Sequence, residues 1–140
     1  MYYNLVLFSV HMYTSIVVLI SSFPGVVTSP NYPDEYPNDL QNTTTIKVEK
    51  GMIIALKFTA FDVEQGEYAF SPGSASPCLF DHLTIKDGDE STLMEKTCGN
   101  ALPKDLVSKS NVVKLHFKTD EIVTKSGWSV TWSAEKPTGE

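Results

Sequence analysis

The stretch Ser29-Pro30-Asn31-Tyr32-Pro33-Asp34-Glu35-Tyr36-Pro37 does most to decide which fold this chain can adopt. Its prolines exclude a helix, because each one fixes its own φ angle, removes a backbone donor and pushes the preceding residue into an extended conformation. Asn31 and Asp34 are residues that favour turns. The segment is therefore predicted to form a rigid double turn that its two tyrosine rings hold in place.

The segments that follow carry the alternation of β-strands. β-Branched residues alternate with polar ones over residues 43–49, and a second alternating segment covers residues 52–61. We expect the two to pair as antiparallel strands of one sheet, joined by a turn at Lys50-Gly51. A break in the alternation predicts a bulge near Ala60. No segment keeps a 3.6-residue period, so several short strands between turns predict a β-sandwich or barrel.

Two later segments are predicted to contribute to the core. Residues 111–117 alternate between apolar side chains that face inward and polar ones that face solvent, among them His116. The last strand, over residues 128–132, alternates aromatic and polar side chains. Trp128 and Trp132 are candidates for a carbohydrate platform, but this alternation favours core positions for both.

Composition limits the classes of partner. The chain has 140 residues, enough for one domain with its own core but not for two. Lysine supplies all 11 basic residues against 17 acidic ones, giving a net charge of −6. Arginine, which is absent, has the planar fork that recognises phosphate and sulfate. We therefore expect no nucleic-acid partner, heparin is disfavoured, and a basic or cation-bearing partner is favoured.

Cys78 and Cys98 are the only cysteines, too few for a structural zinc site without histidine ligands. A disulfide between them would close a loop of about twenty residues and add about 3 kcal/mol of stability in the chain-entropy model. The alternative is two reduced, buried cysteines in a cytosolic protein.

The N-terminus favours the disulfide, because residues 1–22 are predicted to be a signal peptide. Residues 5–20 are mostly apolar but short for a stable membrane span, and the small residues Ser21 and Ser22 offer a cleavage site. No lysine or arginine precedes the apolar region, which departs from the usual pattern. An uncleaved anchor and an N-terminal strand are the alternatives. With a signal peptide, the chain is secreted to the extracellular space.

Five pieces of sequence occur in an order that resembles a CUB domain, an extracellular β-sandwich module. They are the proline-rich run over residues 29–37, Phe58-Thr59-Ala60-Phe61-Asp62-Val63-Glu64, the segment 78–85, Thr97-Cys98-Gly99 and Phe117-Lys118-Thr119-Asp120. The resemblance runs from about residue 25 to residue 133. It implies an all-β, jelly-roll-like antiparallel β-sandwich, with the CUB domain over residues 23–134 and a polar, frayed tail over residues 135–140.

The resemblance also implies a calcium site. In calcium-binding CUB domains, the carboxylates that match Glu64, Asp81 and Asp120 converge at one end of the sandwich and bind Ca²⁺, while a tyrosine that matches Tyr36 supports them by hydrogen bonding. Such a cluster is consistent with physical chemistry, because a divalent cation removes the repulsion among neighbouring carboxylates. Calcium takes 6–8 oxygen ligands, so backbone carbonyls and water must complete the shell.

The chain departs from the family pattern in two places. Calcium-binding members often carry a serine and an asparagine where this chain has Ile122 and Val123, which implies a reduced affinity. Asn42 and Thr44 stand where many CUB domains have a cysteine and a tryptophan, so the first of the two usual disulfides is missing. Asn42-Thr43-Thr44 is instead an N-glycosylation sequon, and Asn42 is the predicted acceptor.

The expected function is non-catalytic, since the chain has no HExxH motif, no glycine-rich phosphate loop and no Gly-x-Ser-x-Gly elbow. The resemblance implies calcium-supported recognition of an extracellular protein, through a lysine of that partner. Three alternatives belong to other classes: a metal-independent structural or adhesion module, a CUB fragment of a larger extracellular protease, and a carbohydrate-binding single-CUB protein.

Overall fold

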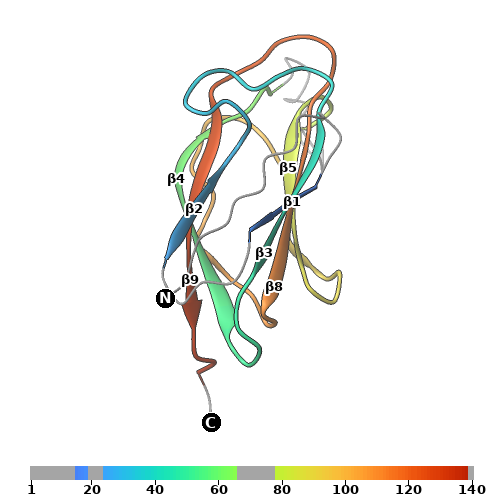
Figure 1. Ribbon diagram of the computed structural model, residues 1–140. Coiled ribbons are helices and arrows are strands. Elements are labelled where there is room, and N and C mark those ends of the chain that lie inside the picture. Colours follow the sequence, from blue (N-terminus) through green and yellow to red (C-terminus); the bar gives the residue numbers. More distant parts are fainter. Residues whose placement is uncertain (1–14, 19–23, 66–77, 139–140) are drawn as a thin grey trace.

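The computed structural model describes residues 15–18, 24–65 and 78–138, and these residues form two facing β-sheets (Figure 1). In chain order the strands are β1 (Ser15–Val18), β2 (Gly25–Thr28), β3 (Gln41–Lys47), β4 (Ile53–Asp62), β5 (His82–Asp87), β6 (Thr92–Thr97), β7 (Leu106–Val107), β8 (Val112–Lys118) and β9 (Gly127–Glu135). One sheet has the order β1-β3-β8-β5-β6 and the other β2-β9-β4-β7. The all-β sandwich prediction is confirmed.

The core lies between the two sheets, where alternate side chains of the long strands meet. Trp128 and Trp132 are 0% and 2% exposed, which confirms their prediction as core residues. The ring of Phe117 packs edge-on against Tyr36 and Trp128, with centroids 4.9 and 5.8 Å apart. Such edge-to-face pairs add to the free energy of burial. Tyr36, which comes from the proline-rich segment, therefore packs within the core.

The expected pairing of segments 43–49 and 52–61 is wrong, because β3 and β4 lie in different sheets. β3 pairs with β8, and β4 pairs with β9 and β7. The chain crosses between the sheets at the Lys50-Gly51 turn, where Gly51 has a φ of 93°. Alternation identifies the buried face of a strand, but it does not identify the strand's neighbour. The predicted bulge is confirmed by a register shift between Phe58 and Ala60.

The N-terminal strand β1 pairs in parallel with β3, with Ser15 opposite Thr43. This strand falls within the predicted signal peptide 1–22, whose other residues, 1–14 and 19–22, lie outside the described part. Cleavage after residue 22 stays a prediction, and it would remove β1 from the edge of β3. Within residues 15–18, 24–65 and 78–138, no helix is long and apolar enough to cross a membrane.

The two cysteines form the predicted disulfide. Cys78 and Cys98 are bonded, with their Cα atoms 5.7 Å apart, and they join the segment before β5 to the end of β6. The bond therefore ties an edge strand of the five-stranded sheet to the start of its neighbour. Of the alternatives open at the sequence level, two reduced cysteines are excluded.

Two smaller predictions need correction. His116 is half-buried, and its Nδ1 atom lies 2.9 Å from the Thr43 hydroxyl, so it is not simply a solvated side chain. Glu135 still belongs to β9 and is paired with Ile53, so it is not frayed. Residues 139–140 of the predicted tail lie outside the described residues.

Candidate metal centre

Three acidic side chains from distant parts of the chain meet at one end of the sandwich. Glu64 follows β4, Asp81 precedes β5 and Asp120 follows β8. Each offers one carboxylate oxygen, and these three oxygens lie within 4.8 Å of one another. The long connections from β2 to β3 and from β8 to β9 lie at the same end of the molecule, at the top of Figure 1. The fold therefore places together the three residues that the sequence predicted as ligands.

Asp81 is the innermost of the three and is 0% exposed. Its Oδ2 atom accepts a hydrogen bond from the Tyr36 hydroxyl at 2.7 Å, and its Oδ1 atom accepts one from the Asp120 backbone N–H at 2.8 Å. Burial raises the pKa of Asp81, and the negative charge of Asp120 adds to that rise although the two hydrogen bonds oppose it. The hydrogen bonds fix the position of the carboxylate without neutralising it.

Tyr36 joins two ligands that come from different strands. Its hydroxyl donates to Asp81 and accepts from the Glu64 backbone N–H at 3.0 Å. Its ring is 1% exposed, and burial raises the pKa of Tyr36 well above its usual range, so the hydroxyl remains a donor. Tyr36 therefore bridges Asp81 and Glu64 by hydrogen bonds, and its role in supporting a metal ion stays a prediction.

The proline-rich segment positions Tyr36 through two consecutive turns, as predicted. The Tyr32 N–H donates to the Ser29 carbonyl at 3.2 Å, and the Asp34 N–H donates to the Asn31 carbonyl at 2.8 Å. Asn31 has a φ of 68°, in the left-handed region that asparagine tolerates. A turn-rich, proline-restricted segment has few alternative conformations, which favours a fixed placement of the tyrosine ring.

The loop that carries Asp120 is anchored to the same segment. The Asp39 N–H donates to the Asp120 carbonyl at 2.8 Å. The Thr119 hydroxyl donates to the Pro37 carbonyl at 2.9 Å and accepts from the Leu40 N–H at 2.8 Å. Contacts to the Asp120 carbonyl and to the Thr119 hydroxyl therefore hold this loop in place, and none of these three contacts uses the Asp120 carboxylate.

The electrostatics of the cluster favour a cation. The pKa of Glu64 is raised from 4.5 to about 7, first by burial and then by the charges of Asp81 and Asp120. Its Oε2 atom is buried and has no hydrogen-bond partner among the described residues. A buried carboxylate oxygen without a donor is costly, and a cation would supply the missing contact.

The donor set fits calcium. All three side chains offer hard carboxylate oxygens, with neither histidine nor cysteine among them, and such a set suits Ca²⁺ or Mg²⁺ rather than softer metals. Calcium needs more oxygens than three monodentate carboxylates supply, so backbone carbonyls and water would complete the shell. A bound ion would neutralise the acidic cluster. Glu64, Asp81 and Asp120 would hold it, and the Tyr36 hydroxyl would keep Asp81 and Glu64 in position.

In the loop after Asp120, the side chains of Ile122 and Val123 are apolar and exposed, and Val123 has a left-handed backbone conformation. Their side chains are 65% and 50% exposed and offer no ligand oxygen, although the Ile122 N–H donates to Asp120 Oδ1 at 3.3 Å. Val123 has a φ of 65°, a left-handed conformation that is strained for a β-branched residue. The sequence identified these two residues as a departure from the family pattern but gave no sign of this strain.

Asn42, the predicted glycosylation acceptor, lies in β3 and is 8% exposed. Its register partner is Phe117, a core residue, and register partners share one face of a sheet. Asn42 therefore lies on the inward face of β3, where a glycan has no solvent around it. This placement counts against occupancy, and glycosylation of Asn42 stays a prediction.

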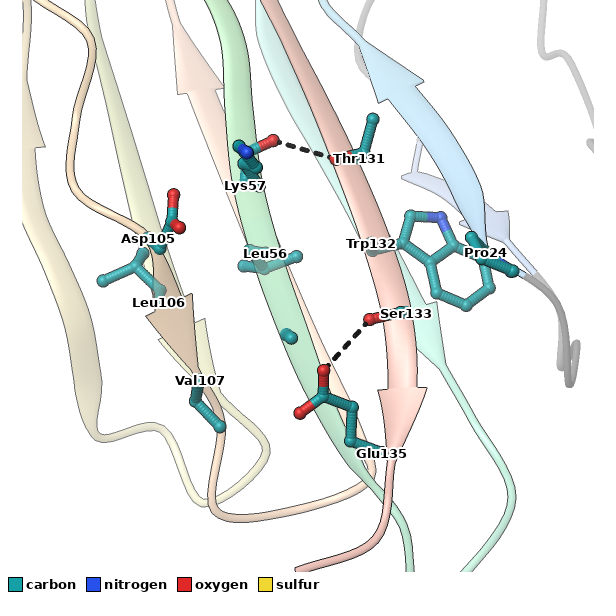
Figure 2. A pocket seen from close by; sticks show the side chains of 11 residues that line it. Pro24, Leu56, Lys57, Asp105, Leu106, Val107, Thr131, Trp132, Ser133 and Glu135 are labelled. Carbon is teal, nitrogen blue, oxygen red and sulfur yellow. Dashed lines mark hydrogen bonds between the residues drawn. The ribbon is translucent and has the colours of Figure 1, made fainter.

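A hollow of about 430 Å³, separate from the acidic cluster, lies over the four-stranded sheet (Figure 2). Some of its polar groups already contact one another: the Thr131 hydroxyl donates to the Lys57 carbonyl at 3.3 Å, and the Ser133 hydroxyl lies 3.5 Å from Glu135 Oε1. Trp132 lines this hollow but is only 2% exposed, so its ring is not available to stack on a sugar. The hollow therefore gives no support to the carbohydrate alternative.

Known proteins share this sequence pattern and this fold. The chain is 35% identical to Tolloid-like protein 1 (Homo sapiens) over 118 residues, which are 83% of this chain and 11% of that protein. It is 38% identical to cubilin (Homo sapiens) over 112 residues, which are 77% of this chain and 3% of that protein. The chain thus spans a small part of the relatives it matches.

A solved structure described as the MASP-1 CUB2 domain bound to Ca2+ superposes with a TM-score of 0.68 and 27% identity, covering 81% of this chain and 96% of that domain. A sequence model of the CUB domain family matches residues 18–132, a match that begins inside the predicted signal peptide. Family match, relatives and fold agree, and the chain belongs to the CUB domain family.

Proposed function

We propose that this chain is a non-catalytic module that binds an extracellular protein with the support of a calcium ion held by Glu64, Asp81 and Asp120. The observation that carries the proposal is the approach of three carboxylate oxygens to within 4.8 Å of one another around a buried tyrosine hydroxyl. CUB domains in general are extracellular binding modules, and the domain of MASP-1 named above is one described as bound to Ca2+. Tyr36 is the positioning residue.

The ion's role is structural as well as electrostatic. Without it, burial and the neighbouring carboxylates raise the pKa values of Glu64 and Asp81, which opposes full ionisation of the cluster. With it, all three carboxylates are charged, and the ion joins the end of β4, the start of β5 and the end of β8. Extracellular calcium modules bind with dissociation constants of about 10⁻⁴–10⁻³ M, and we expect this site to fall in that range.

A lysine of the partner is the group we expect at this end of the molecule. Glu35 and Glu121 are exposed in the two loops beside the site, and the Thr124 hydroxyl, 3.0 Å from Glu35 Oε2, links those loops. A lysine ammonium is a compact point charge with three donors, which suits carboxylate oxygens left free by the ion. Exposed Leu79 and Ile122 flank the ligands in sequence and offer apolar contact to the same partner.

Thermal unfolding with calcium, with magnesium and with chelator tests the metal site. At a calcium concentration about tenfold above the dissociation constant, the midpoint should rise by about 5 °C, since a ligand of the native state stabilises that state. Asp120→Asn should abolish the rise, whereas Asp105→Asn, an exposed aspartate on the connection to β7, should leave it unchanged. Equal midpoints in calcium and chelator would favour the metal-independent structural module.

An oligolysine peptide tests the lysine proposal. Calcium adds positive charge to the protein, so nonspecific attraction of a cationic peptide must weaken when calcium is added. A specific site made by the ion should instead bind the peptide more tightly in calcium than in chelator, and Asp120→Asn should lose that gain. Weaker binding in calcium for the wild-type chain would refute the lysine contact while leaving the metal site intact.

Secretion and the boundaries of the module also belong to this proposal. We propose that residues 1–22 direct export and are cleaved, leaving a CUB domain over residues 23–134. Mass spectrometry of the protein exported by a eukaryotic cell would give the mature N-terminus and would show whether Asn42 carries a glycan. Retention of β1 (Ser15–Val18) in the exported chain would refute the cleavage.

A further inference from the structure

The outer face of the five-stranded sheet is basic although the chain as a whole is acidic. On the central strands β3, β5 and β8, alternate side chains point away from the core, and none of those outward positions holds an acid. They carry Lys47, Lys86, Lys114 and Lys118, and Lys96 adds a fifth lysine from the neighbouring strand β6. The acids close by are Glu90, in the turn after β5, and Glu95 in β6. We call these five lysines the basic face.

Strand register places the charges in rows. Lys118 lies opposite His82 of β5, and Lys114 lies opposite Lys86. Between these two rows, His116 lies opposite Thr84 on one side and Thr43 on the other. Burial lowers the pKa of His116, and Lys114 and Lys86 lower it further against the opposing effect of Glu90. The imidazole thus lies among two lysines and one glutamate.

The lysines of the basic face are largely unneutralised within the described residues. Lys114 forms an ion pair with Glu90 at 2.7 Å, and Lys86 donates to the Thr92 hydroxyl at 2.8 Å. Lys47, Lys96 and Lys118 are exposed. At the Lys118 end the face also has a hollow of about 380 Å³, lined by Gln41, Asn42, Thr43, His82, His116, Phe117 and Lys118.

The spacing of this face favours an extended polypeptide. Lys114, His116 and Lys118 stand on alternate positions of one strand, a repeat of about 6.6–6.8 Å. An extended peptide with acidic side chains at alternate positions presents carboxylates with the same repeat. Lysine pairs readily with carboxylates, whereas sulfate and phosphate groups are recognised best by arginine, which this chain lacks.

We propose that the basic face is a second binding surface, independent of calcium, for an extended acidic segment of a protein. The surface lies on the outside of the sheet, whereas the metal cluster lies at its end, so the two sites can be occupied separately. Their partners differ in charge: a basic group at the calcium end and an acidic segment on the sheet.

The test uses two fluorescent peptides of one composition in chelator, one in which glutamate and threonine alternate and one in which they form two blocks. The wild-type chain should bind the alternating peptide at low salt about threefold more tightly than the block peptide. Raising ionic strength to about 0.15 M should weaken both, because the pairs are exposed.

Lys96→Gln/Lys118→Gln, which removes two exposed lysines of the basic face, should weaken binding of the alternating peptide about three- to tenfold, as expected for the loss of two exposed ion pairs. The control Lys57→Gln/Lys104→Gln changes net charge equally but alters lysines outside the basic face, and it should bind like the wild type. Circular dichroism of both variants checks that they fold. No binding of either peptide, an equal loss in both variants, or binding of a heparin oligosaccharide without binding of the peptides would overturn the proposal.

Discussion

Asp81 and Asp87 lie at opposite ends of β5 and are both 0% exposed, yet they have different surroundings. Asp87 accepts hydrogen bonds from the Gly88 and Lys109 backbone N–H groups, each at 2.7 Å, and from the Ser110 hydroxyl. Burial alone would raise its pKa, but these hydrogen bonds together lower it. Its charge is fully compensated by donors within the fold.

Asp81 has donors too, but it also has acidic neighbours. Tyr36 and the Asp120 N–H donate to it, while the carboxylates of Glu64 and Asp120 approach within 4.8 Å. Its pKa is raised rather than lowered. Both aspartates are buried, so burial alone does not identify a metal ligand. Asp81 differs from Asp87 because other carboxylates lie close to it and the hydrogen-bond donors of the protein do not balance their combined negative charge.

The largest change in the free energy of unfolding should come from substituting Asp87, the aspartate whose charge is balanced by hydrogen-bond donors. Asp87→Ala leaves backbone and hydroxyl donors without their acceptor, and we expect a loss of about 3 kcal/mol of unfolding free energy. Because no metal is involved, urea titrations should give the same loss in calcium and in chelator. Asp89→Ala is the control, since Asp89 is exposed and contacts Ser91, and it should cost less than about 0.5 kcal/mol. A loss for Asp87→Ala that vanishes in calcium would contradict the comparison.

The next largest change should be the loss, in Asp81→Asn, of the stabilisation that calcium gives. The amide keeps an acceptor for Tyr36 but removes one negative charge, so we expect the stabilisation by saturating calcium, about 1–2 kcal/mol, to disappear. In chelator the lower repulsion within the cluster favours the variant, but an amide has one acceptor oxygen where the carboxylate had two. The Asp120 N–H therefore loses its acceptor, and we expect a net loss of about 1 kcal/mol of unfolding free energy in chelator. Asp62→Asn, beside the site but outside the cluster, should retain the calcium effect. Retention of the calcium effect in Asp81→Asn would remove Asp81 from the site.

The pH dependence of the free energy of unfolding should change sign when calcium is added. The folded-state pKa of Glu64, about 7, exceeds its ordinary value of 4.5. In chelator, this group's contribution to stability is present below about pH 4.5 and is lost as pH rises through 7. Calcium binds the ionised form, so its affinity should increase over the same range with release of protons. Calorimetry in two buffers of different ionisation enthalpy measures that release; the absence of proton release at pH 6 would contradict the account.

The smallest change in stability should come from substituting Val123, in the loop after Asp120. Val123→Asn replaces a strained β-branched residue at φ 65° with one that tolerates this conformation, and should raise stability in chelator by about 0.5–1 kcal/mol. Its amide oxygen also offers a ligand atom, so calcium affinity should rise severalfold. Ile122→Asn makes the same polarity change without a left-handed φ and should not stabilise. Equal effects of both substitutions on stability in chelator would mean that backbone strain is not the cause.

Much of this fold could be predicted from the sequence, because alternation specifies which side chains of a strand are buried. Trp128, Trp132 and the bulge near Ala60 were found in this way. The neighbours of each strand could not be predicted in this way, and β3 and β4 were wrongly paired. Which of the two sheets a strand joins depends on contacts between residues far apart in the chain. The basic face was missed for the same reason: its lysines alternate visibly along β8, but only the register brings Lys86 beside them.

The candidate site was predicted only through family resemblance. Nothing in the separations of positions 64, 81 and 120 brings them together, and the structure does so because β4 and β8 end, and β5 begins, at one place. The features that argue most directly for a cation are the orphaned Oε2 atom of Glu64 and the raised pKa values. Both depend on burial and distance, which the sequence does not contain.

Calorimetric titration of calcium into the wild-type chain and into Asp120→Asn decides whether Glu64, Asp81 and Asp120 form one calcium site. We expect one ion per wild-type chain with a dissociation constant of about 10⁻⁴–10⁻³ M, and no measurable binding to the variant. Absence of binding to the wild-type chain, or the same binding to both proteins, would contradict this expectation.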